Sequence, residues 1–179
     1  MDAGREAFVT EAYAGLYRWF HRLTGSPEWA SDLTQETFTA FWASETRRKL
    51  DVSPITWLYA IGRNQWRKRL RDHRAHESEA LAEPVAGGRT AEERAQDREF
   101  QDAARDALAR LPHDLREAFT LRFWNEFSYQ EIGQIQGIDP GLARWRYFTA
   151  RRRLHRELAA WDPSRELSGG DAHGRVRES

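Results

Sequence analysis

The chain has 179 residues, enough for one domain or two small ones and too few for a large enzyme scaffold. It carries 28 Lys and Arg against 28 Asp and Glu, so only the distribution of charge can indicate a basic binding face. The lack of cysteine excludes disulfides, thiolate metal sites, iron–sulfur clusters and cysteine nucleophiles. The charged N-terminus leads into no signal-length apolar stretch, and no apolar run approaches the roughly 20 residues of a bilayer span, so we expect a soluble, cytoplasmic protein.

The first part of the chain has the periodicity of amphipathic helices. Apolar residues recur at spacings of three and four over 8–23, 27–44 and 55–74, which predicts three helices. Ser26 is placed to cap the second of these, and Pro27 suits its first turn. We therefore predict a small helical bundle.

The composition changes in the segment 77–100. It contains Pro84, Gly87 and Gly88, has few large apolar residues, and carries more acidic than basic side chains. Such a segment cannot bury enough surface to offset its chain entropy. We predict a flexible acidic linker, whose last part from Thr90 can be helical and lead into the next domain.

A second helical block follows, and it contains a helix–turn–helix pattern. Ser128 and Glu131 have the spacing of a capping box at the start of a short helix. Gly137 lies in the turn, and Asp139 followed by Pro140 is the expected start of the last helix. This arrangement matches the DNA-reading version of the motif.

No segment shows sustained strand alternation, so we predict an all-α fold. We expect two small helical domains, a helical bundle over 8–76 and a helix–turn–helix domain over 101–160, joined by the flexible acidic linker over 77–100. Residues 161–179 are polar and contain glycine, and we expect a disordered tail there.

The predicted last helix is strongly basic. Arginine on such a helix can bind guanine edges or phosphates through paired hydrogen bonds. An ordinary helical hairpin with a solvated basic face is the alternative, and the two caps together with the six arginines favour DNA binding. These arginines are Arg144, Arg146, Arg151, Arg152, Arg153 and Arg156.

A second basic stripe lies on the helix predicted over 55–74, where arginines recur at steps of four, four and three. Aromatic residues between cations are what single-stranded nucleic acid needs for stacking. The same aromatic residues could instead be core residues beside solvated arginines, and the residues alone leave both interpretations open. The arginines are Arg63, Arg67, Arg71 and Arg74, and the aromatic residues are Trp57, Tyr59 and Trp66.

Three polar residues, Asp32, Gln35 and Glu36, share one face of the second predicted helix. Taken alone, they indicate a solvent-facing surface. Enzyme chemistry has less support, because the sequence has no glycine-rich phosphate loop, no nucleophile elbow and no paired histidines at zinc spacing with an acid base. The one candidate metal cluster, His73 to Glu77, lies at the end of a basic helix and is disfavoured. We expect no catalytic residues, no metal site and no cofactor.

Together these segments resemble the extracytoplasmic-function group of bacterial RNA polymerase sigma factors. Residues 32–38 resemble the family's core-polymerase-binding motif, and residues 57–64 resemble its promoter-melting and minus-ten segment. The second block follows the family's second domain in order and spacing at Leu111-Pro112, Arg116, Leu121-Arg122, Glu131-Ile132-Gly133, Gly137-Ile138 and Ala150 to Leu154.

The resemblance implies a non-catalytic polymerase subunit that recognises the minus-thirty-five and minus-ten promoter elements and promotes DNA melting. Asp32, Gln35 and Glu36 would contact the clamp helices of the largest polymerase subunit, and the flap is a further contact. The loop 47–55 would capture an unstacked base. The implied minus-ten contacts are Trp57, Tyr59, Arg63, Asn64 and Arg67. The implied minus-thirty-five contacts are Arg144, Trp145, Arg146, Thr149, Arg151 and Arg152.

The implied partners are core RNA polymerase and promoter DNA, with an anti-sigma factor as a further partner that the resemblance allows, and no membrane insertion. A helix–turn–helix regulator that acts without polymerase docking is the alternative, and a sigma-like docking decoy is a third hypothesis. The chain departs from the usual family pattern at Ser31, Gln65, Trp66, Arg67, Lys68, Gln136, Leu142, Ala143 and Trp145.

Overall fold

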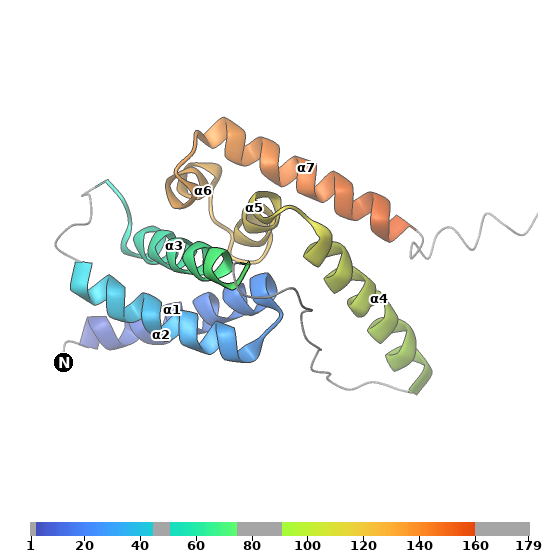
Figure 1. Ribbon diagram of the computed structural model, residues 1–179, viewed down its shortest axis with the longest axis horizontal. Coiled ribbons are helices and arrows are strands. Elements are labelled where there is room, and N and C mark those ends of the chain that lie inside the picture. The colour runs from blue at the N-terminus through green and yellow to red at the C-terminus, as the bar shows by residue number, and fades with distance from the viewer. Residues whose placement is uncertain (1–2, 45–50, 75–90, 160–179) are drawn as a thin grey trace, which may run out of the picture.

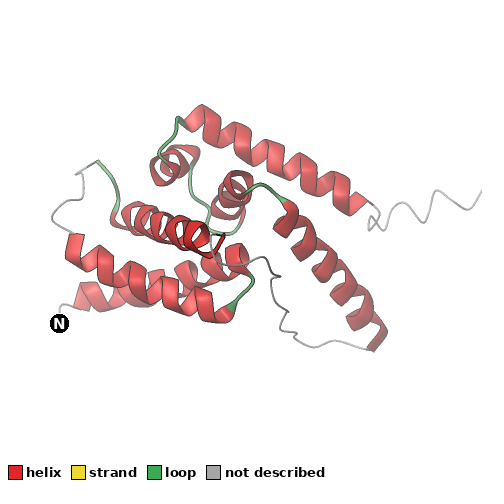
Figure 2. Cartoon of the chain, viewed as in Figure 1, coloured by secondary structure: helices red, strands yellow, loops and turns green. Residues whose placement is uncertain are grey.

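The computed structural model describes residues 3–44, 51–74 and 91–159, and in these ranges the chain forms seven α-helices and no strand (Figures 1 and 2). The all-α prediction is confirmed. The helices are α1 (Ala3–Thr24), α2 (Pro27–Ser44), α3 (Pro54–Arg74), α4 (Ala91–Arg110), α5 (His113–Phe123), α6 (Tyr129–Gln136) and α7 (Pro140–Leu158).

Helix α4 begins at Ala91, so residues 91–100 of the predicted linker are helical and lead directly into the second domain. Residues 51–55 of the predicted loop 47–55 are described, and α3 already begins at Pro54. Residues 47–50 of that loop, the rest of the predicted linker and the predicted tail lie outside the described residues.

The helix starts follow from capping chemistry. The Ser26 hydroxyl accepts a hydrogen bond from the Trp29 amide at 3.2 Å at the start of α2. At α6 the predicted capping box is present: the Ser128 hydroxyl accepts from the Glu131 amide, and the Glu131 carboxylate accepts from the Ser128 amide. The Asp139 carboxylate accepts from the Gly141 amide at 2.7 Å and starts α7.

The turn between α6 and α7 depends on a close backbone approach at Gly133. The Ile138 amide donates to the Gly133 carbonyl at 2.9 Å. A Cβ at this glycine would lie 2.8 Å from the Ile138 carbonyl oxygen, closer than real Cβ contacts allow. Gly137 ends α6 in the left-handed conformation with φ of 67°. The predicted turn of the helix–turn–helix therefore depends on two glycines, one for the close approach and one for the left-handed conformation.

Helices α1, α2 and α3 pack through a large apolar core. The predicted stripe on α1 is buried, and so are Leu33 and Phe41 of α2 and Leu58 of α3. A second, smaller core joins α4, α5 and α7 and includes Leu111, Leu115 and Leu154. Burial of each such side chain contributes about 1.5–3 kcal/mol, which is why these positions set the register of each helix.

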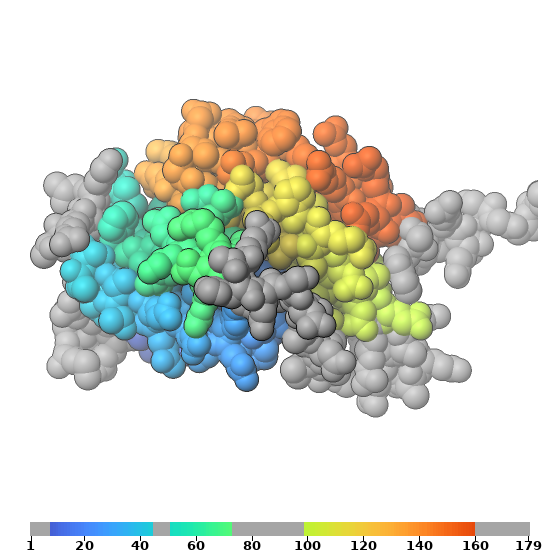
Figure 3. Space-filling model, in the orientation of Figure 1, coloured from blue at the N-terminus to red at the C-terminus, as the bar shows by residue number. Residues whose placement is uncertain are grey.

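The two domains pack directly against each other, an arrangement that the sequence did not predict. Leu121 of α5 and Ile132 of α6 belong to the same buried cluster as Leu16 of α1 and Leu58 of α3. Helix α3 lies between the N-terminal helices and α6, and α1 packs directly against α5 (Figure 1). The space-filling view shows the two domains in contact (Figure 3).

Candidate polymerase and nucleic-acid interfaces

The three polar residues of α2 form an exposed ridge. The side chains of Asp32 and Glu36 are 57% and 53% exposed, and Gln35 is exposed between them. Arg69 of α3 flanks the ridge, with a guanidinium nitrogen 3.2 Å from an Asp32 carboxylate oxygen. The structure thus brings all three residues to one open face, where the carboxylates are available to a cationic partner.

The aromatic residues of α3 do not form an open stacking platform. Tyr59 and Trp66 are buried in the core, and Trp57 is half-buried. The Tyr59 hydroxyl accepts a hydrogen bond from the Asn125 side chain of the second domain at 2.9 Å, and burial raises the pKa of this phenol. In this conformation Tyr59 cannot contact DNA, and the core interpretation holds for it and for Trp66.

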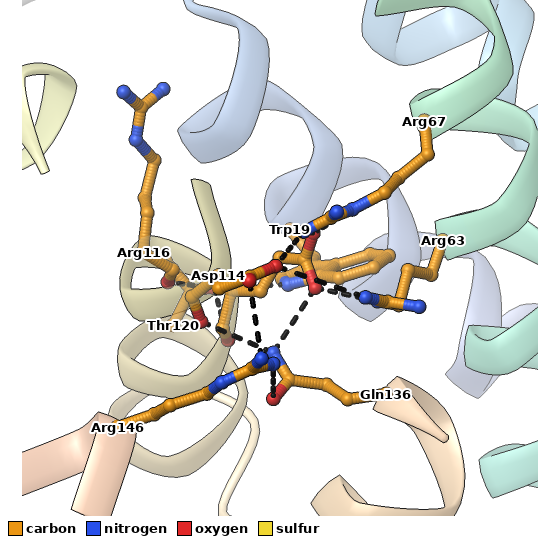
Figure 4. Close-up of polar contacts among 9 residues, drawn as sticks. Trp19, Arg63, Arg67, Asp114, Arg116, Thr120, Gln136 and Arg146 are labelled. Atoms are coloured by element: carbon orange, nitrogen blue, oxygen red, sulfur yellow. Dashed lines mark hydrogen bonds and ion pairs between the residues drawn. The ribbon is translucent and has the colours of Figure 1, made fainter. Parts of the chain in front are cut away.

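Two arginines of α3 point into the second domain (Figure 4). The Nε of Arg63 donates to the Glu117 carboxylate at 2.6 Å, and the Nε of Arg67 donates to the other oxygen of that carboxylate at 2.7 Å. Arg67 also pairs with Asp114. Asn64, the neighbouring predicted minus-ten residue, is exposed.

Helices α6 and α7 contribute to the same cluster. A guanidinium nitrogen of Arg146 lies 3.1 Å from an Asp114 oxygen, and another donates to the Gln136 side-chain oxygen at 3.0 Å. The Gln136 amide donates to the Glu117 carboxylate at 3.0 Å. We call Arg63, Arg67, Arg146, Asp114, Glu117 and Gln136 the interdomain cluster.

Contacts in and beside the interdomain cluster explain three departures from the family pattern. Arg67 supplies an ion pair, and Gln136 satisfies both a carboxylate and an arginine where an apolar side chain could satisfy neither. Trp66 packs edge-on against His113, with ring centroids 5.5 Å apart. All three residues therefore make contacts across or beside the domain boundary.

Charge pairing makes the burial of these groups tolerable. Glu117 is fully buried and would be costly to keep ionised without Arg63 and Arg67. Burial opposes ionisation of Asp114, but the hydrogen bond and charge of Arg67, followed by the charges of Arg146 and Arg63, outweigh it and lower the pKa of Asp114.

The outward face of α7 remains open. Arg144, Arg151 and Arg152 are exposed, and the Trp145 side chain is 57% exposed beside them. The Arg144 guanidinium lies 5.6 Å from the ring centroid of Phe148. Thr149 is buried, so in this conformation it cannot contact DNA.

Sequence reasoning missed Asp114 and Glu117, which join the two predicted DNA interfaces. Their spacing of three places both on one face of α5, and Glu117 lies four residues before the buried Leu121. A carboxylate on the apolar face of a helix was the signal, because it needs a partner from outside that helix. Which arginines would pair with it depended on how the domains pack.

The described ranges contain neither a group of metal ligands nor a membrane-spanning helix. Within them, no three His, Asp or Glu side chains are grouped to hold a metal ion. None of the helices there is both long and apolar enough to span a bilayer.

Residues 8–76 match the family profile of Sigma-70 region 2, and residues 101–154 match that of Sigma-70 region 4. The chain is 34% identical over 157 residues to the RNA polymerase sigma factor CarQ of Myxococcus xanthus, covering 88% of this chain and 89% of that one. It is 26% identical over 154 residues to the ECF sigma factor SigW of Bacillus subtilis, covering 80% and 82% of the two chains.

Among solved structures, the fold is similar to that of the sigma factor RpoE, which was crystallised in complex with the anti-sigma factor NepR from Bartonella quintana. The TM-score is 0.71 at 24% identity, over 88% of this chain and 98% of that chain. The ordered motifs, the two matched regions and the similarity to CarQ lead to one conclusion: this chain belongs to the extracytoplasmic-function group of RNA polymerase sigma factors.

Proposed function

We propose that the chain is a non-catalytic promoter-specificity subunit that acts in the cytoplasm on bacterial core RNA polymerase. The observation that carries this proposal is that an exposed carboxylate ridge on α2 and an exposed basic face on α7 lie on different domains of one sigma-family chain. One domain can then bind the polymerase while the other reads DNA.

The bundle over 8–76 is proposed to bind core polymerase and the minus-ten element. Asp32, Gln35 and Glu36 contact the clamp helices of the largest subunit, because the exposed carboxylates suit a basic surface. The domain over 101–160 contacts the flap and the minus-thirty-five element. The linker over 77–100 connects the two domains.

The proposed DNA contacts fall into two groups. Arg144, Trp145, Arg151, Arg152 and Asn64 are exposed in this conformation and can meet DNA directly. The others need the domains to separate or the helix to shift, since their side chains are buried, half-buried or paired: Trp57, Tyr59, Arg63, Arg67, Arg146 and Thr149.

An anti-sigma factor is a further proposed partner. The Bartonella quintana sigma factor of similar fold is bound to the anti-sigma factor NepR. The exposed rings of Phe123 and Trp124, with centroids 5.0 Å apart, offer this chain an apolar surface for such a contact, and Trp145 is a further exposed aromatic side chain on α7.

The test uses core polymerase reconstituted with the full chain, with transcript mapping and gel filtration as readouts. Asp32→Ala with Glu36→Ala should abolish core binding while circular dichroism stays unchanged, because both side chains are exposed. Asp102→Ala with Asp106→Ala, also exposed and of equal charge change, should bind core normally. A chain that ignores core polymerase yet binds one duplex specifically would instead be a helix–turn–helix regulator.

A further inference from the structure

The interdomain cluster joins arginines from both proposed DNA interfaces to the same two carboxylates. Arg63 and Arg67 come from the minus-ten helix α3, and Arg146 comes from the minus-thirty-five helix α7. Asp114 and Glu117 lie one turn apart on α5. Figure 4 shows Asp114 with Arg63 and Arg67 on one side and Arg146 on the other. Each arginine that pairs with them is unavailable to a phosphate.

The two carboxylates present an arrangement similar to that of a nucleic-acid backbone. They offer closely spaced anionic oxygens to guanidinium groups, with contacts of 2.6 Å and 2.7 Å at Glu117 and 3.1 Å from Arg146 to Asp114. DNA phosphates provide the same acceptor chemistry, so DNA and the α5 carboxylates compete for the same donors.

Further contacts across the boundary hold the domains together, and one of them engages the proposed minus-ten residue Tyr59. The Arg116 guanidinium donates to the Leu23 carbonyl of α1 at 3.0 Å, and the Tyr59 ring packs edge-on against Phe127 with centroids 4.8 Å apart. The Asp114 side chain is 41% exposed. Solvent and competing anions can therefore reach the cluster from its edge.

We propose that Asp114 and Glu117 are an internal competitor for promoter DNA, which pairs with Arg63, Arg67 and Arg146 and keeps the free chain closed until the domains separate. The proposal rests on the proposed function, because it assigns those arginines to DNA. It goes further by naming the residues that suppress DNA binding by the free chain and the event that releases them.

The first test measures closure directly. The chain has no cysteine, so Thr39→Cys on α2 and Arg153→Cys on α7, both exposed, accept a donor and acceptor dye without competing thiols. Asp114→Asn with Glu117→Gln should lower the energy transfer, because neutral amides no longer hold three arginines. Asp102→Asn with Asp106→Asn removes the same charge from exposed sites on α4 and should leave the transfer unchanged.

The second test measures DNA binding by the free chain without polymerase, by fluorescence anisotropy on a duplex and on a single strand. The double α5 variant should bind at least about tenfold more tightly than the α4 control. Its plot of log affinity against log salt should steepen by about 0.9 for each arginine released to a phosphate. The comparison with the α4 control removes the general effect of lowering negative charge.

Circular dichroism separates opening from unfolding. If the double variant loses helix, Asp114→Asn alone provides the test, because that side chain is partly exposed, and it should produce a smaller change in the same directions. Unchanged energy transfer together with DNA affinity equal to the α4 control, in a folded variant, overturns the proposal. Failure of the wild-type chain to bind core polymerase would instead overturn the proposed function. The energy-transfer measurement of closure uses the free chain and does not depend on core binding.

Discussion

The indole Nε1 of Trp19 donates a hydrogen bond to the Thr120 hydroxyl at 3.0 Å, and both side chains are fully buried. This bond joins α1 to α5 and so links the two domains. Its donor and acceptor residues are 101 positions apart in the sequence. The Thr120 hydroxyl in turn contacts the Arg116 and Glu117 carbonyls. A polar pair inside an apolar interface fixes the relative placement of the domains, because any other alignment would leave the indole nitrogen unsatisfied.

Thr120→Val should therefore lower the free energy of unfolding by about 1–3 kcal/mol, the cost of leaving a buried donor without its acceptor. Urea unfolding followed by tryptophan fluorescence measures the change. Thr39→Val, the same exchange at an exposed position of α2, should change stability far less. Equal effects of the two exchanges would mean that the Trp19 bond contributes nothing to the interface.

Gly133→Ala should destabilise the helix–turn–helix by about 1–3 kcal/mol, because the added methyl group would clash with the Ile138 carbonyl oxygen. This oxygen belongs to the backbone, so it cannot rotate away as the end of a flexible side chain could. Thermal unfolding measures the effect. Gln130→Ala on the exposed side of the same helix is the control and should be nearly neutral. A fully stable Gly133→Ala protein would contradict the close approach of α6 to the turn.

Arg152→Ala should weaken promoter binding by the reconstituted polymerase and reduce the salt dependence of that binding by about one unit of slope, as expected for one lost phosphate contact. Binding is measured across a series of potassium chloride concentrations. Arg110→Ala removes another exposed arginine, from α4 and outside the proposed DNA contacts, and should retain the wild-type slope. Identical slopes for both variants would place Arg152 away from DNA.

Acid should open the free chain. The pKa of Asp114 is lowered in the closed form, where Arg67, Arg146 and Arg63 surround it beside Glu117, relative to about 3.9 for an exposed aspartate. The closed form is thus favoured above that value and loses this stabilisation as pH falls through the lowered pKa. Energy transfer in the dye-labelled chain should fall below about pH 4. Asp114→Asn should lack the part of this fall in energy transfer that protonation of Asp114 causes. If energy transfer in that variant changes with pH as in the wild-type chain, the role of Asp114 is refuted.

Local patterns in the sequence were sufficient for the helices. Ser128, Glu131 and Asp139 determine where α6 and α7 begin, since capping involves only neighbouring residues. The spacing of Asp32 and Glu36 likewise placed both on one exposed face, because helical periodicity fixes direction over one turn. The sequence alone did not distinguish core from stacking roles for Tyr59 and Trp66, since an aromatic side chain fits both.

The sequence by itself thus determined the helices, the caps, the turn and the family, all of which depend on short-range periodicity or ordered motifs. Only the tertiary structure decided that Arg63, Arg67 and Arg146 meet Asp114 and Glu117. Those charges lie on helices far apart in the chain, and their pairing follows from the packing of two apolar surfaces, which no local pattern encodes.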